Sequence, residues 1–209
     1  MDFYIYLIVA YFLGGLPFGL AVGYMFGHGD IRKKGSGNIG STNIWRIAGG
    51  KAATIVFVGD IGKGIAAVLL CQYYYTPQYP ISFEAASLLA GFLAVLGHSF
   101  SPYLKFQGGK GVNTALGVFI SVLPIQALTA LSVFLLIVAV TRYVSLGSIV
   151  ATLTLAVILW VEKYAMNQPV ANSYLVSTTV VAVLILITHR QNIKRLIAGN
   201  ENRFEFGRR

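Results

Sequence analysis

The sequence predicts an all-α integral membrane protein in which seven transmembrane helices, several of them short, form a compact bundle. Of its 209 residues, 56% are hydrophobic and only 11% are charged, and the mean hydropathy is +0.70. Ordinary soluble domains are much less apolar. The apolar residues recur in long runs, with no long linker and no convincing internal repeat between them. We therefore expect a single transmembrane domain that comprises residues 1–209.

Seven apolar runs are candidates for membrane crossings. They are residues 3–26, 54–75, 82–97, 112–123, 125–141, 145–161 and 173–188. Several are shorter than the roughly 20 residues that a straight crossing requires. The first run lacks a basic leader and a convincing cleavage site, so we expect it to be retained rather than removed as a signal peptide. The stretch 112–140 forms either one helix kinked at Pro124 or two short helices that meet there.

The distribution of basic residues favours two helices in that stretch. With seven crossings, 15 of the 16 lysines and arginines lie on one side of the membrane, and only Lys163 lies on the other. Cytoplasmic connections carry such an excess of positive charge, whereas six crossings would place the basic tail outside. We therefore expect an N-terminus outside and a C-terminus in the cytoplasm, in a multi-pass protein of the bacterial cytoplasmic (inner) membrane.

Three polar clusters interrupt the apolar sequence, at residues 35–43, 98–114 and 189–192. The predicted topology places all three on the cytoplasmic side. Glycine-rich turns, hydroxyl groups and helix N-termini present donors that hold anions. The candidate binding residues are Ser36, Gly37, Asn38, Gly40, Ser41, Thr42, Asn43, Arg46, His98, Lys105, Gly108, Gly109, Lys110, Gly111, Asn113, His189 and Asn192.

Each cluster also has a simpler interpretation. A Gly/Ser/Asn loop before a helix is often only a turn and a cap, and a lone histidine such as His189 often just ends a helix. Arg46 strengthens the case for a site, because one helical turn after Thr42 its guanidinium can face an anion held by the loop. His189 and Asn192 would share one helical face if the helix continues through them.

Several classes of site are excluded by what the sequence lacks. Lys110 is followed by Gly111, so the second cluster is not a Walker A phosphate loop. The seven acidic residues do not cluster, which argues against a two-metal centre. We expect no metal and no cofactor, and no nucleic acid partner, because the basic residues lie between apolar spans. Asp60 and Lys63 are most simply an ion pair one helical turn apart.

These clusters resemble, in order and content, the three signature blocks of the bacterial acyl-phosphate-dependent glycerol-3-phosphate acyltransferases. The blocks are Ser36–Asn43, Gly97–Phe100 continuing through Gly108–Val112, and His189–Ile193. The segment from Asp60 to Gly64 is also similar to that family. The sequence departs from the family pattern at Gln107, Asn113 and Gln191, where the family usually has a lysine, a small residue and a glutamate.

The resemblance implies transfer of a fatty acyl group from acyl phosphate to the 1-hydroxyl of sn-glycerol 3-phosphate, which yields lysophosphatidate and phosphate. Its partners would be these two substrates and membrane lipid, and we expect a monomer. The phosphates would meet Ser36, Asn38, Arg46, Lys105 and Lys110, with Ser36, His189 and Asn192 as catalytic candidates. No Gly-x-Ser-x-Gly elbow or reactive cysteine is present, so direct attack without an acyl-enzyme is expected.

Two questions stay open at this point. The proton acceptor is either His189 or a phosphate oxygen of a substrate. The alternative to an acyltransferase is a transporter or channel for a phosphorylated anionic solute. Such a protein should have polar groups along several mid-membrane segments, whereas here the polar groups lie at one face. A structural subunit that only binds anionic lipid would explain the charge but not the Ser-Gly-Asn cluster.

Overall fold

The computed structural model describes residues 3–205, and in this range it contains helices and loops but no strands. The predicted all-α class is confirmed. The elements are α1 (Phe3–Gly15), α2 (Phe18–Met25), the 3-10 helix η1 (Ile31–Lys33), α3 (Ser41–Tyr74), α4 (Phe83–Ser99), the 3-10 helix η2 (Pro102–Leu104), α5 (Val112–Val122), α6 (Pro124–Thr141), α7 (Val144–Tyr164), α8 (Asn172–Thr188) and α9 (Arg190–Ile197).

The seven predicted crossings are not confirmed as seven. Within the described residues, five segments are long and apolar enough to cross a membrane: Phe3–Met25, Ser41–Tyr74, Phe83–Leu104, Pro124–Thr141 and Val144–Tyr164. A sixth results if α8 and α9, which meet at 63°, count as one bent span. Helix α5 has 11 residues, about 16 Å at the usual rise, which is half of the apolar thickness of a bilayer.

The helix boundaries differ from those expected at two places. The first apolar run is broken between α1 and α2, because Pro17 has no N–H group to continue the helix. Helix α3 begins at Ser41, well before the predicted start at residue 54, and Gly49 interrupts its regular geometry with a φ of 79°. Of the two alternatives for residues 112–140, the structure has the two short helices, which meet at Pro124.

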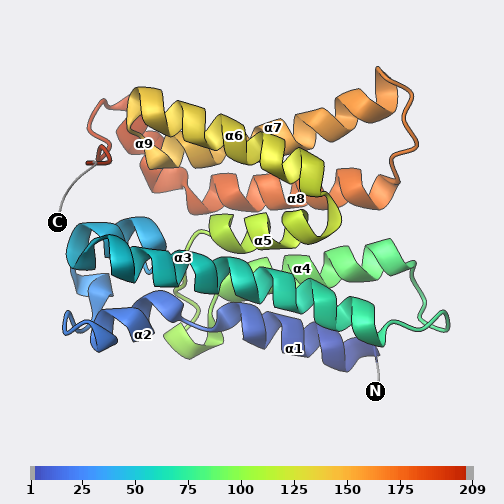
Figure 1. The fold of residues 1–209 in the computed structure, drawn as a ribbon, viewed down its shortest axis with the longest axis horizontal. Coiled ribbons are helices and arrows are strands. Elements are labelled where there is room, and N and C mark those ends of the chain that lie inside the picture. Colours follow the sequence, from blue (N-terminus) through green and yellow to red (C-terminus); the bar gives the residue numbers. More distant parts are fainter. Residues whose placement is uncertain (1–2, 206–209) are drawn as a thin grey trace.

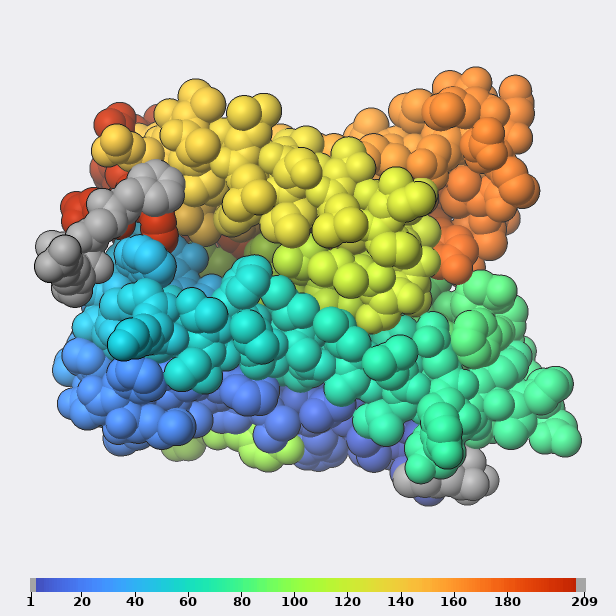
Figure 2. Space-filling view, viewed as in Figure 1, coloured from blue at the N-terminus to red at the C-terminus, as the bar shows by residue number. Residues whose placement is uncertain are grey.

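The helices form two groups with α5 between them (Figure 1). Helices α1 to α4 pack together on one side of α5, and α6 to α8 pack together on the other. Close packing within the first group depends on small residues: a Cβ added to Gly14 would lie 2.1 Å from the carbonyl oxygen of Ala94, and one added to Gly97 would lie 2.0 Å from that of Tyr11. Figure 2 shows a hollow between α3 and α6, where the two groups separate.

Candidate functional site

A cavity of about 390 Å³ lies between the two groups of helices, and all three polar clusters contribute to its wall. Residues from α3, α6 and α7 line it together with the segment after α9. The predicted site residues that it brings together are Ser36, Asn38, Gly40, Ser41, Thr42, Asn43, Arg46, His98, Lys110, Gly111, Asn113, His189 and Asn192. Segments that are more than 150 positions apart in the sequence thus share one site.

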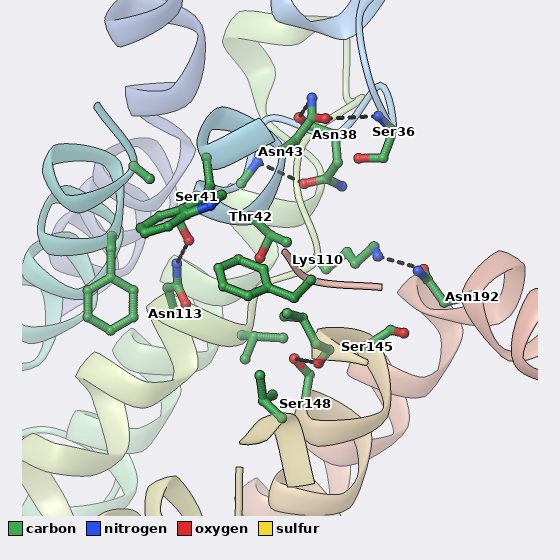
Figure 3. Close-up of a pocket in the computed structure, with 18 of the residues that line it drawn as sticks. Ser36, Asn38, Ser41, Thr42, Asn43, Lys110, Asn113, Ser145, Ser148 and Asn192 are labelled. Carbon is green, nitrogen blue, oxygen red and sulfur yellow. Dashed lines mark hydrogen bonds between the residues drawn. The ribbon is translucent and has the colours of Figure 1, made fainter. Parts of the chain in front are cut away.

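The first cluster is held in shape by Asn43. Its amide group donates hydrogen bonds to the carbonyl oxygens of Ile31 (3.3 Å), Lys34 (3.2 Å) and Asn38 (2.8 Å). Its oxygen accepts one from the backbone N–H of Ser36 at 2.8 Å (Figure 3). All the hydrogen-bonding groups of this side chain are therefore occupied within the loop. Asn43 therefore fixes the shape of the loop.

Two helix N-termini begin at the cavity. Helix α3 starts at Ser41 and α5 starts at Val112, and both of these residues line the cavity wall. The amide of Asn113 donates a hydrogen bond to the hydroxyl oxygen of Ser41 at 3.1 Å, which ties the two ends together (Figure 3). The unpaired N–H groups and the positive dipole end of a helix favour anions. This part of the cavity is suited to a phosphate group.

A chain of hydrogen bonds then links the second cluster to the segment after α9. The ammonium group of Lys110 donates to the side-chain oxygen of Asn192 at 2.5 Å, and the Asn192 amide donates to Glu201 at 2.7 Å. Glu201 also accepts hydrogen bonds from Arg195 at 2.6 Å and from Ser145 at 3.1 Å. Each of these five side chains lines the cavity.

The charges along this chain affect one another. Burial lowers the pKa of Lys110 to about 8; the carboxylate of Glu201 acts against this shift, and the nearby guanidinium groups add to it. For Glu201, burial alone would raise the pKa, but the hydrogen bonds from Asn192 and Arg195 bring it below its ordinary value. At neutral pH this wall therefore carries a cationic Lys110 beside an ionised Glu201.

His189 lies at the junction between α8 and α9, where the chain bends by 63°. The helix does not continue straight through it, yet His189 and Asn192 line the same cavity. Its Nδ1 lies 2.9 Å from the carbonyl oxygen of Ile185. A carbonyl oxygen can only accept, so Nδ1 carries the proton and Nε2 keeps a free lone pair. The neighbouring Arg190 is exposed and does not line the cavity.

The structure places four predicted residues outside the cavity wall. Lys105 is exposed at a left-handed position (φ 52°) and does not line the cavity, so its contact with phosphate stays a prediction. Gly37, Gly108 and Gly109 do not line the cavity. The backbone N–H groups of Gly108 and Gly109 donate to the carbonyl oxygens of Ser99 and His98, which pins the glycine loop to the end of α4. The two lysines of the second cluster, Lys105 and Lys110, thus have different environments.

Several residues of the wall were not predicted. The hydroxyls of Ser145 and Ser148, three positions apart on α7, lie across the cavity from Ser41 and Thr42 (Figure 3). Their i, i+3 spacing on an apolar helix was a signal for a polar face. Glu201 lies in the tail, where the sequence offered no such signal. Further unpredicted residues of the wall include Trp45, Asp60, Arg195, Asn202 and Phe204. The ring centroids of Trp45 and Phe204 lie 5.2 Å apart.

An apolar cavity adjoins the first one. A second cavity of about 80 Å³ lies between α3, α5, α6 and α7, and it shares Phe57, Val112, Asn113 and Phe134 with the first. Its wall includes small residues such as Ala127 and Ala130. The combined space therefore has a polar, cationic end and an apolar end, as a ligand with an anionic head and a hydrocarbon tail requires.

Comparison with known proteins agrees with this geometry. The glycerol-3-phosphate acyltransferase of Chlorobaculum tepidum is 39% identical to the chain, and the alignment covers 100% of this chain and 99% of that protein. The glycerol-3-phosphate acyltransferase of Trichlorobacter lovleyi is 42% identical, over 94% of each protein. The solved glycerol 3-phosphate form of PlsY (YgiH), an integral membrane glycerol 3-phosphate acyltransferase, is 36% identical with a TM-score of 0.85, over 97% of this chain and 96% of that one. Since the profile of the family Glycerol-3-phosphate acyltransferase also matches residues 4–199, the chain belongs to the glycerol-3-phosphate acyltransferase family.

Proposed function

We propose that the protein transfers a fatty acyl group from acyl phosphate to the 1-hydroxyl of sn-glycerol 3-phosphate, the first acylation step of phospholipid synthesis. The observation that carries this proposal is a pair of adjoining cavities: the first has two helix N-termini, Arg46 and Lys110 in its wall, and the second is apolar. Both proposed substrates carry phosphate, and one also carries a hydrocarbon tail. PlsY itself has been solved in a glycerol 3-phosphate form and in a lysophosphatidic acid form.

The chemistry needs little more than placement and charge. The glycerol hydroxyl oxygen attacks the carbonyl carbon of the acyl phosphate, the bond from that carbon to the phosphate oxygen breaks, and phosphate leaves. The hydroxyl proton passes to Nε2 of His189 and then to the departing phosphate. The phosphate charges are neutralised by Lys110 and Arg46, and the phosphate oxygens accept hydrogen bonds from the N–H groups at Ser41 and Val112. The hydrocarbon tail lies in the apolar cavity.

Direct attack follows from the nature of the donor. Acyl phosphate is a mixed anhydride with a good leaving group, so a protein nucleophile is not required. Ser36 is exposed at the loop and contributes its backbone N–H to Asn43. We assign it a phosphate-binding role. We further propose a monomeric enzyme that uses neither a metal nor a cofactor.

The test of this function is phosphate release by the purified protein in detergent. Palmitoyl phosphate should release phosphate only when glycerol 3-phosphate is present, with lysophosphatidate as the product, and intact-protein mass spectrometry in a single turnover should show no acyl adduct. Activity with palmitoyl-CoA alone would overturn the donor but keep the family reaction. A trapped acyl-Ser36 would overturn direct attack.

The apolar cavity should determine which chain lengths are accepted. Ala127, buried on α6, lines this cavity, and Ala127→Leu adds three carbon atoms to it. We expect the ratio of kcat/KM for palmitoyl phosphate to that for decanoyl phosphate to fall about tenfold, because each excluded methylene loses about 0.8 kcal/mol. Ala139→Leu, at an exposed position of the same helix, is the control. An equal ratio in both variants would place the tail elsewhere.

We also propose seven crossings, with α5 as a short one and the active site facing the cytoplasm. The start of α1 and the helix α9 lie at opposite ends of the bundle, which supports an odd number of passes (Figure 1). With Cys71 replaced by alanine, single cysteines at the exposed positions Gln168 and Lys194 report the two sides. A membrane-impermeant maleimide should label Gln168→Cys in intact cells and Lys194→Cys only after lysis. The reverse pattern would invert the topology.

A further inference from the structure

Beneath the phosphate site lies a cluster of ionisable side chains that the proposed reaction does not use. Asp60, Lys63 and His98 are only 2%, 3% and 4% exposed, on the membrane-spanning helices α3 and α4. The ammonium group of Lys63 lies 2.9 Å from Asp60 Oδ1 and 2.7 Å from His98 Nδ1. It also donates to the carbonyl oxygen of Leu16 at 3.1 Å. Ionisable groups are costly inside a membrane and call for a functional explanation.

The contacts of Lys63 join three helical segments at the point where one of them is broken. Leu16 lies in the break between α1 and α2, where Pro17 leaves carbonyl groups without their usual helical partners. Lys63 satisfies one of these carbonyls from α3, while its other partner, His98, comes from α4. The cluster therefore fixes the break of the first span relative to the two helices behind the site.

His98 connects the cluster to the glycine loop. Lys63 has only hydrogens to donate, so the close contact makes Nδ1 of His98 the acceptor and leaves the ring proton on Nε2. That side of the ring lies directly against the loop: a Cβ added to Gly109 would lie 2.0 Å from Nε2. Gly109 has no side chain to displace and is followed by Lys110, whose ammonium group reaches Asn192 in the cavity.

We propose that Asp60, Lys63 and His98 form a buried brace that sets the position of Gly109 and, through it, of Lys110 in the phosphate site. All three are positioning residues for the acyl transfer: Nδ1 of His98 accepts a hydrogen bond from Lys63, and the Nε2 edge of its ring lies against Gly109. The proposal rests on the proposed function of the cavity. It explains why the site needs glycine at position 109 although the backbone there is not left-handed.

A comparison of two neighbouring glycines tests the contact between His98 and Gly109. Gly109→Ala should lower kcat/KM at least roughly tenfold, because the added methyl group collides with the imidazole. His98→Asn removes the outer edge of the ring but keeps an oxygen acceptor for Lys63. In the His98→Asn background, Gly109→Ala should lower kcat/KM less than about twofold. An undiminished loss in that background would overturn the proposal.

Gly108→Ala is the matched control. A Cβ at Gly108 would lie 2.0 Å from the backbone oxygen of His98 and 2.9 Å from the carbonyl carbon of Ser99. No change of the His98 side chain removes these atoms, so Gly108→Ala should be equally damaging in both backgrounds. If His98→Asn also reduced the loss of kcat/KM caused by Gly108→Ala, the histidine substitution would be loosening the whole glycine loop. That result would also overturn the proposal.

A second double-mutant cycle, between Lys63 and Lys110, covers the case in which the His98→Asn variant does not fold. Lys63→Met should lower kcat/KM at least roughly tenfold in the wild type but less than about twofold in the Lys110→Met background, because the brace acts through Lys110. A general loss of structure would instead multiply the two effects and overturn the proposal. Wild-type turnover is measured first, so that a failure of the proposed function is told apart from a failure of the brace. If the wild type does not turn over acyl phosphate, the proposed donor is refuted. Both mutant cycles are then run with acyl-CoA as the donor.

Discussion

Lys110→Met is expected to lower kcat/KM for glycerol 3-phosphate by at least roughly 100-fold. The substitution removes two interactions at once: the proposed contact of the ammonium group with a substrate phosphate and the hydrogen bond to Asn192. Each charge-assisted hydrogen bond is worth about 1.5 to 3 kcal/mol, and about 1.4 kcal/mol corresponds to a tenfold change. Steady-state kinetics with acyl phosphate at saturation measures the loss. The melting temperature of the variant in detergent should stay near that of the wild type.

Lys105→Met is the matched control, because Lys105 lies five positions earlier in the same cluster but is exposed and outside the cavity. We expect its kcat/KM to remain within about twofold of the wild type, as for most exposed substitutions. Equal losses at both lysines would refute this assignment of the phosphate site.

The pH profile gives an independent readout of Lys110. Its pKa is about 8, below the ordinary value for lysine because of burial. The ammonium form that binds phosphate is therefore present below this pH and is lost above it. In the wild type, kcat/KM should fall by about tenfold per pH unit above that pKa. Lys110→Arg stays charged and should lack this decline.

The polar site could be predicted from the sequence because topology constrains it strongly. The predicted alternation of crossings places every second connection on the same side, and the structure does bring the loop at residues 35–43, the glycine loop and the residues around His189 to one cavity. Glycines, hydroxyls and basic residues in those connections then indicated anion binding. The family assignment agrees with the acyltransferase prediction and gives no support to the transporter or to the structural subunit.

What the sequence could not provide was the direction of individual side chains. Lys105 and Lys110 are lysines of the same glycine-rich segment, and nothing in the sequence tells them apart. In the structure the backbone is left-handed at Lys105 and Phe106, and the two lysines have different environments. Glu201 follows α9 in an irregular segment, so no periodicity could place it beside Asn192. Asp60 and Lys63 were correctly expected to pair. Their link to His98 depends on how two helices pack, which local spacing does not encode.

His189→Gln is expected to lower kcat at least roughly 100-fold with little change in KM, because a general base contributes about 100- to 10,000-fold and glutamine cannot take up the proton. The hydrogen bond from Nδ1 to Ile185 leaves Nε2 as the only ring nitrogen with a free lone pair. Rapid-quench measurement of lysophosphatidate in a single turnover isolates the chemical step. Arg190→Gln, at the exposed neighbouring position, serves as the control and should keep full activity. Near-full activity of His189→Gln, with an unchanged pH profile, would instead assign proton acceptance to a phosphate oxygen of a substrate.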